Sequence, residues 1–192
     1  MAIEIDPLMV ESLSWRAKLE VVHADVLQTD LTQWGPAVVA GNLPYYITSP
    51  ILEKIFAARQ FISNAVILVQ KEVAVRITAP RNSRDYGYLS VLCQTYAETK
   101  SLFNVAPGSF SPPPRVDSAV VNLKLRQDIP DQTQFLTFAS RVFRQKRKTL
   151  RNNLLPFYEK KLLESMPEAG LRAEQLEIEQ LKDLELRLRE NA

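Results

Sequence analysis

The chain has 192 residues, of which 46% are hydrophobic and 24% are charged, which is enough for one or two globular domains. The formal net charge of +2 is too small to indicate nucleic-acid binding by itself. No signal peptide and no apolar run long enough to cross a bilayer is found, so the sequence predicts a cytoplasmic protein. The single cysteine, Cys93, excludes a disulfide framework or a cysteine-based metal site, and we expect no metal.

Strands alternate with helices along the first 127 residues. Strands are expected at 1–6, 19–24, 38–40, 65–70, 100–105 and 118–125, and helices at 8–15, 51–58, 70–77 and 88–96. This alternation predicts an α/β fold with a mostly parallel sheet. A parallel strand is normally covered on both sides, so few domains have one as their first element. We therefore expect a strand to be missing in front of residue 1.

The stretch Gly41-Asn42-Leu43-Pro44-Tyr45-Tyr46-Ile47-Thr48-Ser49-Pro50 follows the apolar run 37–40. Its two prolines predict a turn that leads into the helix at 51–58. In an open α/β sheet, ligands bind at such strand ends.

These residue types suit the alkylation of an exocyclic amine on a nucleobase. The lone pair of such an amine is delocalised into the ring, so a site must accept its hydrogen bonds and hold the base still. Asn42 could supply an amide oxygen and Leu43 a backbone carbonyl, while Pro44 fixes the turn and Tyr45 stacks on the base. A plain turn with a tyrosine in the core explains the same four residues about equally well.

Acidic residues follow the first two expected strands. Glu4 lies at the end of the first, where it could accept hydrogen bonds from both hydroxyls of a ribose, and Asp25 could accept from an adenine amine. The alternative is that such residues cap the following helices. Residue types alone favour capping for Asp6 and Asp25 and leave Glu4 open. His23 has no evident partner and is expected to be a strand or surface residue.

Two later segments could contact RNA. The loop at 80–87 carries Arg81, Arg84 and Tyr86, although most such loops are only solvated. The segment at 107–117 contains three consecutive prolines that hold Phe110 ahead of the last strand, where it could enclose a base together with Tyr45. Packing of Phe110 in the core is the alternative.

The pattern changes at residues 128–130, and we place a domain boundary there, between 1–127 and 128–192. Apolar residues then recur at three- and four-residue spacing from Phe135 to Leu154, which predicts an amphipathic helix. Its other side is basic, with no acid among residues 141–151: Arg141, Arg144, Lys146, Arg147, Lys148 and Arg151. An unbalanced charge of this kind predicts a phosphate-binding surface. A last helix is expected at 173–189.

Taken together, several motifs resemble one known family. They are Asn42-Leu43-Pro44-Tyr45, Gln70-Lys71-Glu72-Val73, Tyr86-Gly87-Tyr88-Leu89-Ser90-Val91, the proline-rich stretch 110–120 and the basic stretch 143–152. In this order they resemble the ribosomal RNA adenine dimethyltransferases over essentially the whole chain. The proline-rich and basic stretches favour the bacterial small-subunit branch, whose loss gives kasugamycin resistance, over the sibling branch that methylates large-subunit RNA and confers macrolide resistance.

The resemblance implies a Rossmann-like methyltransferase domain followed by a small all-α domain. It also implies the use of S-adenosylmethionine (SAM) to dimethylate the N6 amines of two adjacent adenosines near the 3′ end of small-subunit ribosomal RNA, with a role in ribosome maturation. The implied partner is therefore the assembling small ribosomal subunit.

The resemblance also assigns roles to the residues of this chain that match functional positions of the family. Glu4 matches the acid that binds the SAM ribose and Asp25 the residue that contacts its adenine. The segment Asn42, Leu43, Pro44 and Tyr45 matches the one that orients the amine, with Asn42 also beside the cofactor, and Phe110 matches a second stacking aromatic. Arg144, Lys146, Arg147, Lys148 and Arg151 match the basic part that docks on the subunit.

One departure from the family concerns the cofactor site. Family members have a central strand with a glycine-rich turn before the segment that matches residues 1–6, whereas the five glycines here include no Gly-x-Gly. We therefore expect an N-terminally truncated methyltransferase fold in which the strands beginning at Ala2 and Val38 lack their shared neighbour and leave apolar edges unpaired. Two hypotheses follow, an rRNA adenine dimethyltransferase or a catalytically silent RNA-binding or ribosome-assembly module. The absent turn favours the second for this chain.

Overall fold

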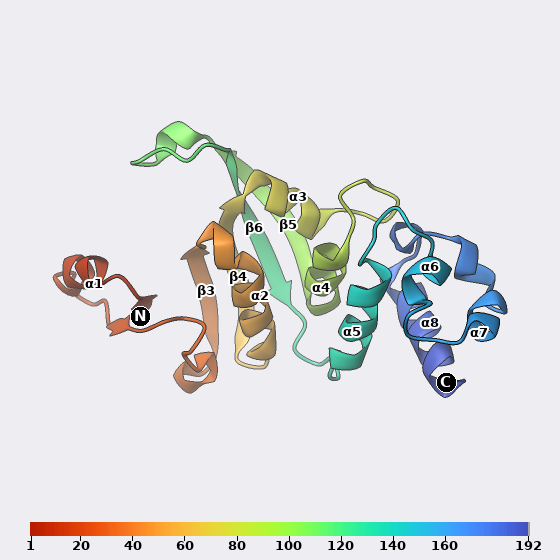
Figure 1. The fold of residues 1–192 in the computed structure, drawn as a ribbon. Coiled ribbons are helices and arrows are strands. Elements are labelled where there is room, and N and C mark those ends of the chain that lie inside the picture. Colours follow the sequence, from red (N-terminus) through yellow and green to blue (C-terminus); the bar gives the residue numbers. More distant parts are fainter. Residues whose placement is uncertain (192) are drawn as a thin grey trace.

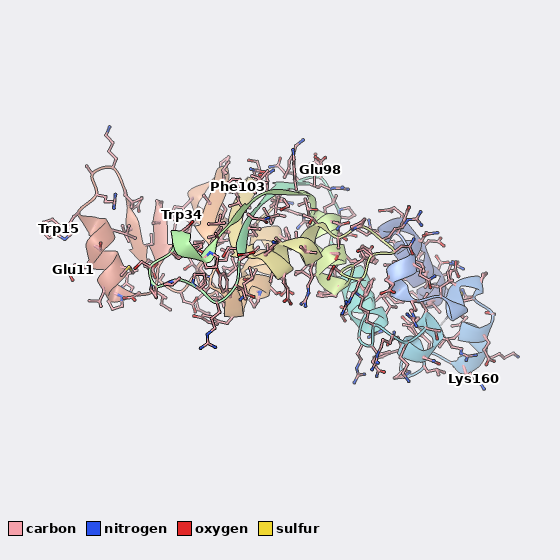
Figure 2. All side chains as sticks on the ribbon, turned by 90° about the horizontal axis from the view of Figure 1, so that it is seen from above. Glu11, Trp15, Trp34, Glu98, Phe103 and Lys160 are labelled. Carbon is pink, nitrogen blue, oxygen red and sulfur yellow. The ribbon has the colours of Figure 1, made fainter. Side chains whose placement is uncertain are left out.

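A computed structural model describes residues 1–191 of the chain. The strands are β1 (Ala2–Glu4), β2 (Val21–His23), β3 (Ala37–Asn42), β4 (Ile62–Gln70), β5 (Ala97–Val105) and β6 (Ser118–Leu125). The α-helices are α1 (Pro7–Ser14), α2 (Thr48–Ala57), α3 (Lys71–Thr78), α4 (Tyr88–Tyr96), α5 (Thr133–Val142), α6 (Leu150–Leu154), α7 (Lys160–Glu164) and α8 (Ile178–Glu190). The molecule is elongated, with Trp15 at one end and Lys160 at the other (Figure 2).

The strands and helices predicted within residues 1–127 are present, with ends that differ from the predicted ones by up to three residues. Helix α2 begins at Thr48 rather than at residue 51, since a proline such as Pro50 is tolerated in a first turn, where its missing N–H costs no hydrogen bond. The last helix begins at Ile178, after a short 3-10 turn at Ala173–Gln175. The sheet is parallel only in part, because β5 and β6 form a hairpin that adds two antiparallel pairings.

The strands form two separate sheets. One contains only the parallel pair β1–β2, and the other has the order β3-β4-β6-β5, in which β3 and β4 are parallel. Strand β3 has no partner on its other side among the residues described, and Figure 1 shows β1, β2 and α1 lying beyond it, away from the rest of the sheet. The expected gap between the strands that begin at Ala2 and Val38 is therefore confirmed.

The four-stranded sheet has one covered face and one more open face. Residues of β4 alternate between buried and half-buried positions, as expected for a strand with a core on one side. Its buried residues Ile67 and Val69 pack with α2, α3 and α4 in one hydrophobic cluster. Alternate pairs of the parallel pairing lie on the open face, among them Ala40 beside Val66 and Asn42 beside Leu68.

The segment before β3 is weakly attached. None of residues 1–24 is buried, and Ile5, Leu8 and Trp15 are exposed although they are apolar. The first contacts with the core come from Val26 and Leu27. An apolar segment that buries so little surface gains little free energy from folding against the sheet.

We therefore expect hydrogen exchange to be fastest in this segment. Amides of β1 and β2 should exchange at least about a hundredfold faster than those of β4 and β6, because regions with few buried contacts open at low free energy. Hydrogen-exchange mass spectrometry of the native chain measures both regions in one sample. Equal protection of β1 and β4 would contradict this description.

The carboxyl-terminal part has a core of its own. Helices α5 to α8 (Figure 1) enclose a second cluster that includes Phe138, Leu150, Leu181 and Leu188, and residues from the first half of the chain, such as Tyr86, join it. Burial raises the pKa of the Tyr86 hydroxyl to about 12, so it is neutral at ordinary pH. Within residues 1–191, no helix is both long enough and apolar enough to cross a membrane.

The predicted amphipathic helix from Phe135 to Leu154 is wrong in one respect. It is broken into α5 and α6, and residues 143–149 form a turn between them. The side chain of Asn153 holds this turn, since its Nδ2 donates to the carbonyls of Val142 (2.9 Å) and Gln145 (3.1 Å) and its Oδ1 accepts from the Gln145 N–H (3.1 Å). These bonds replace the helical hydrogen bonds lost at the break.

Candidate functional site

The segment Asn42 to Tyr45 lies at the carboxyl edge of the four-stranded sheet. Asn42 is the last residue of β3, and the backbone N–H of Leu43 still donates to the carbonyl of Leu68 on β4 (3.1 Å). The side chain of Leu43 is buried in the core. Pro44 then begins a 3-10 turn, Tyr45–Ile47, that runs into α2. The backbone of this segment is thus fixed from both sides.

Two hydrogen-bond acceptors in this segment are unused. Within residues 1–191, neither the side-chain amide of Asn42 nor the carbonyl of Leu43 is part of a hydrogen bond of the structure. The side chain of Asn42 is exposed on the open face of the sheet, next to Leu68. Two neighbouring acceptors match the two N–H groups of an exocyclic amine.

Tyr45 is held by a residue that the sequence did not single out. Its hydroxyl lies 2.7 Å from Oγ of Ser118, which is fully buried at the start of β6. This contact joins two segments 73 residues apart and fixes the orientation of a half-buried ring. Tyr46, in contrast, is 87% exposed.

Phe110 is on the tip of the β5–β6 hairpin, just after the 3-10 turn Pro107–Ser109. Because β6 is antiparallel to β4 and Ser118 lies opposite Gln70, this tip is at the same edge of the sheet as Asn42. Phe110 is half-buried and stacks on no other aromatic ring within residues 1–191. The proposed sandwich with Tyr45 therefore stays a prediction.

Glu4 and Asp25 lie at the corresponding edge of the small β1–β2 sheet. Glu4 ends β1, and its Oε1 accepts from the backbone N–H groups of Ile5 (2.8 Å) and Asp6 (2.9 Å). Asp25 follows β2 by two residues, and its Oδ1 accepts from the N–H of Leu27 (2.8 Å). Capping is confirmed for Asp6, whose Oδ1 accepts from Leu8 in the first turn of α1 (2.9 Å).

The second oxygen of each of these carboxylates is unused. Neither Oε2 of Glu4 nor Oδ2 of Asp25 accepts a hydrogen bond within the described chain, so each can accept from a ligand hydroxyl or amine. Free carboxylate oxygens are acceptors of the kind that ribose hydroxyls and an adenine amine need, and the assignment of Glu4 and Asp25 to these groups stays a prediction.

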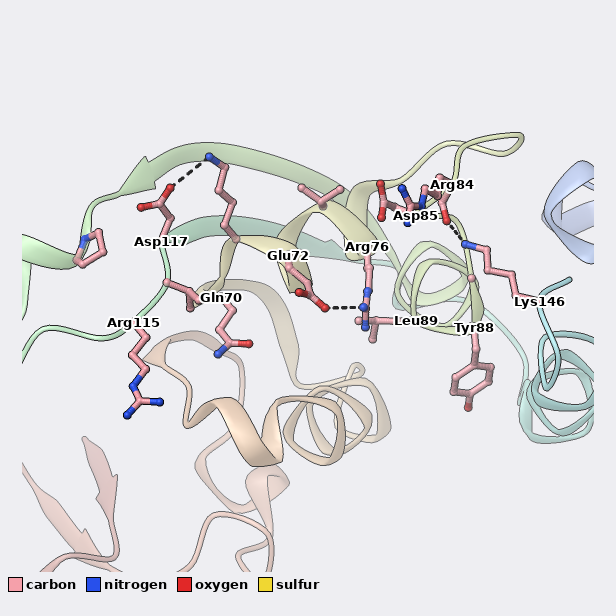
Figure 3. A pocket seen from close by; sticks show the side chains of 15 residues that line it. Gln70, Glu72, Arg76, Arg84, Asp85, Tyr88, Leu89, Arg115, Asp117 and Lys146 are labelled. Carbon is pink, nitrogen blue, oxygen red and sulfur yellow. Dashed lines mark hydrogen bonds and ion pairs between the residues drawn. The ribbon is translucent and has the colours of Figure 1, made fainter.

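A cleft of about 1070 Å³ opens beside the ends of β4 and β6 (Figure 3). Five cations line it: Lys71, Arg76, Arg84, Arg115 and Lys146. Lys71 is 3.4 Å from the carboxylate of Asp117, and Arg76 is 2.5 Å from Glu72. Tyr88 also lines the cleft, and burial raises the pKa of its hydroxyl, so this group is neutral at ordinary pH. The motif containing Lys71 and Glu72 thus belongs to a surface that its sequence alone did not reveal.

Four of the five basic residues predicted to bind RNA lie on the turn at 143–149, and only Arg151 lies on a helix. Arg144, Arg147 and Lys148 are exposed, and their side chains make no ion pair within residues 1–191. Lys146 bonds to the backbone carbonyl of Arg84 and lies 3.9 Å from Glu174, while Arg151 on α6 lies 3.7 Å from Glu164.

Asn153 is therefore expected to be a stability residue for this turn. Asn153→Ala should lower the free energy of unfolding by about 2–3 kcal/mol, because it leaves buried backbone groups without partners. Asn152→Ala, at the exposed neighbouring position, should cost less than about 0.5 kcal/mol. Urea denaturation followed by circular dichroism measures both. Equal losses would show that the hydrogen bonds of Asn153 do not hold the turn.

Comparisons with solved structures identify the fold. The structure is similar to a dimethyladenosine transferase from Plasmodium falciparum, with a TM-score of 0.79 at 24% identity over 98% of this chain and 80% of that chain. It is also similar to the 23S rRNA methyltransferase ErmE, with a TM-score of 0.68 at 26% identity over 97% of this chain and 80% of that chain. The fold is therefore that of a Rossmann-like methyltransferase.

The sequence comparisons are more specific. Residues 1–189 match the family described as ribosomal RNA adenine dimethylase, so the chain belongs to this family. It is 40% identical to the ribosomal RNA small subunit methyltransferase A of Thermotoga maritima and 39% identical to that of Koribacter versatilis, over 96% and 91% of this chain. The alignments cover 65% and 70% of those two proteins, so the chain spans about two thirds of their length.

Proposed function

We propose that the chain serves the SAM-dependent dimethylation of adenine N6 amines in small-subunit ribosomal RNA. The observation that carries this proposal is the pair of unused acceptors at Asn42 and Leu43, on a backbone that is hydrogen-bonded to β4. Membership of the ribosomal RNA adenine dimethylase family supports it.

The residues of the chain would act mainly by positioning. The Asn42 amide oxygen and the Leu43 carbonyl would accept the two hydrogens of the amine and turn its lone pair out of the ring plane, which restores its nucleophilicity. Tyr45, fixed by Ser118, would hold one face of the base, and Phe110 on the hairpin tip the other. Placing two bound reactants in line supplies most of the acceleration in reactions of this kind.

Glu4 and Asp25 would hold the cofactor. Their unused carboxylate oxygens would accept hydrogen bonds from the ribose hydroxyls and the adenine amine of SAM, and Asn42 would lie between the cofactor and the target base. When bound, SAM supplies a methyl group as an electrophile, and the reaction needs no metal. The substrate would be two adjacent adenosines near the 3′ end of the RNA, in a small subunit that is being assembled in the cytoplasm.

A second function is favoured by the separation of the two sheets. Residues 1–24 are not buried against the part that carries Asn42, so a chain in which they fail to hold SAM would act as a silent RNA-binding or assembly module. Calorimetric titration of SAM distinguishes the two. The enzyme predicts binding in the micromolar to millimolar range that is weakened by Glu4→Gln. The silent module predicts salt-sensitive binding to small subunits with no heat from SAM.

A further inference from the structure

The cleft beside β4 and β6 joins the two surfaces proposed to bind RNA. At one end lie Gln70 and Asp117, and Asp117 precedes Ser118, the partner of the Tyr45 hydroxyl. At the other end lies Lys146, which belongs to the basic turn. A nucleic-acid strand that reaches from the Tyr45 side of the sheet to this turn can pass through the cleft.

We propose that this cleft binds the single-stranded RNA that flanks the target nucleotide, and that Arg84 and Arg115 hold its phosphates. The two arginines extend from different segments, the loop before α4 and the connection before β6, and lie at different ends of the view in Figure 3. Both are exposed, and neither makes an ion pair within residues 1–191. The inference rests on the proposed function for the identity of the RNA, but not for its binding.

Two other cations of the cleft, Lys71 and Arg76, are engaged only in exposed ion pairs, whereas Lys146 bonds to the carbonyl of Arg84 and lies beside Glu174. In the Lys71–Asp117 pair both side chains are close to half exposed, and in the Arg76–Glu72 pair more than half. Exposed ion pairs of this kind contribute little to stability. An RNA phosphate can therefore replace the carboxylate of Asp117 or Glu72 as the partner of the cation. Because they compete in this way, the two carboxylates lower the affinity of the cleft for any anion.

The lining favours a single strand over a duplex. Val75, Leu89, Val116 and Tyr88 lie among the charged residues, so the cleft offers apolar surface for base faces. Unpaired bases can use such surface, whereas in a duplex they are stacked inside and only the backbone is presented. The basic turn, in contrast, offers exposed cations without such a lining.

The first test is the double variant Arg84→Ala/Arg115→Ala in the full chain. A fluorescein-labelled single-stranded RNA is titrated by anisotropy at several salt concentrations. Two lost phosphate contacts should lower the slope of log K against log salt by roughly 1.4 and the affinity at 0.1 M salt by about 25-fold. Arg16→Ala/Arg172→Ala removes two exposed arginines outside the cleft, which form no ion pair with any described residue, and should change neither quantity.

The second test uses a variant that is expected to raise the RNA affinity. Glu72→Gln releases Arg76 and should raise the affinity for the same RNA by up to about fivefold, with a steeper salt dependence. Glu179→Gln releases Lys182 from a similar pair (2.9 Å) outside the cleft and should leave the affinity unchanged. A purely structural role for the Arg76–Glu72 pair predicts no gain.

The cleft proposal is overturned if both cleft variants bind like the native chain, or if a duplex of the same sequence binds as tightly as the single strand. These outcomes are separate from the fate of the proposed function, because they use binding alone. Methyl transfer with unchanged binding in the cleft variants would keep the function and reject the cleft. Altered RNA binding in the cleft variants, combined with no methyl transfer by the native chain, would keep the cleft proposal and reject the proposed function.

Discussion

Replacing Asn42 with alanine is expected to lower methyl transfer to RNA by at least about a hundredfold while RNA affinity changes less than about twofold. The amide is exposed and makes no hydrogen bond with any residue of the described part of the chain, so its loss should leave the fold intact. Removing one group that stabilises developing charge typically costs a factor of about 10² to 10³ in rate. Leu43 would still accept one hydrogen of the amine, which leaves some residual activity.

The measurement is single-turnover transfer of labelled methyl groups, with RNA affinity determined in parallel. Asn191→Ala is the control, since it removes an exposed asparagine amide at the far end of the chain from Asn42. If the Asn42 variant loses affinity and rate by the same factor, the residue binds RNA in general and does not orient the amine.

The triple variant Arg144→Ala/Arg147→Ala/Lys148→Ala should weaken binding to small ribosomal subunits by about two orders of magnitude at 0.1 M salt. These cations are exposed and make no ion pair with the residues that the structure describes, and each can release one counterion equivalent, so the slope of log K against log salt should fall by roughly 2 to 3. Arg151 is omitted because Glu164 already lies beside it, at 3.7 Å.

The matched control for this variant is Arg16→Ala/Lys161→Ala/Arg172→Ala, which removes the same charge from scattered exposed positions. Sedimentation with small subunits across a range of salt concentrations measures both triples. Similar losses in the two would mean that only net charge matters and that the turn is not a docking surface.

The sequence predicted those features that depend on neighbouring residues. The strands that carry Glu4 and precede Pro44 follow from short apolar runs, although each ends two residues away from the predicted position, and the turn at Pro44 follows from the backbone restriction of proline. The gap in the sheet was predicted from the family resemblance and is confirmed by the absence of pairing between β1 and β3.

Features that depend on distant residues were not predicted. The Ser118 hydroxyl reaches Tyr45 across 73 residues, and nothing near either residue signals the contact. The basic segment has helical spacing, but the hydrogen bonds of Asn153 to residues 8 and 11 positions earlier favour a turn instead. The cleft likewise combines α3, the loop before α4 and the hairpin, so its cations come together only in the folded chain.

The most direct test of the account is nucleoside mass spectrometry of small-subunit RNA after incubation with this chain and SAM. The subunits should come from cells that lack the corresponding modification. We expect N6,N6-dimethyladenosine in the native reaction and its loss with the Asn42 variant. Subunits that bind the chain but contain no methylated adenine would contradict the proposed enzyme and leave the silent RNA-binding module.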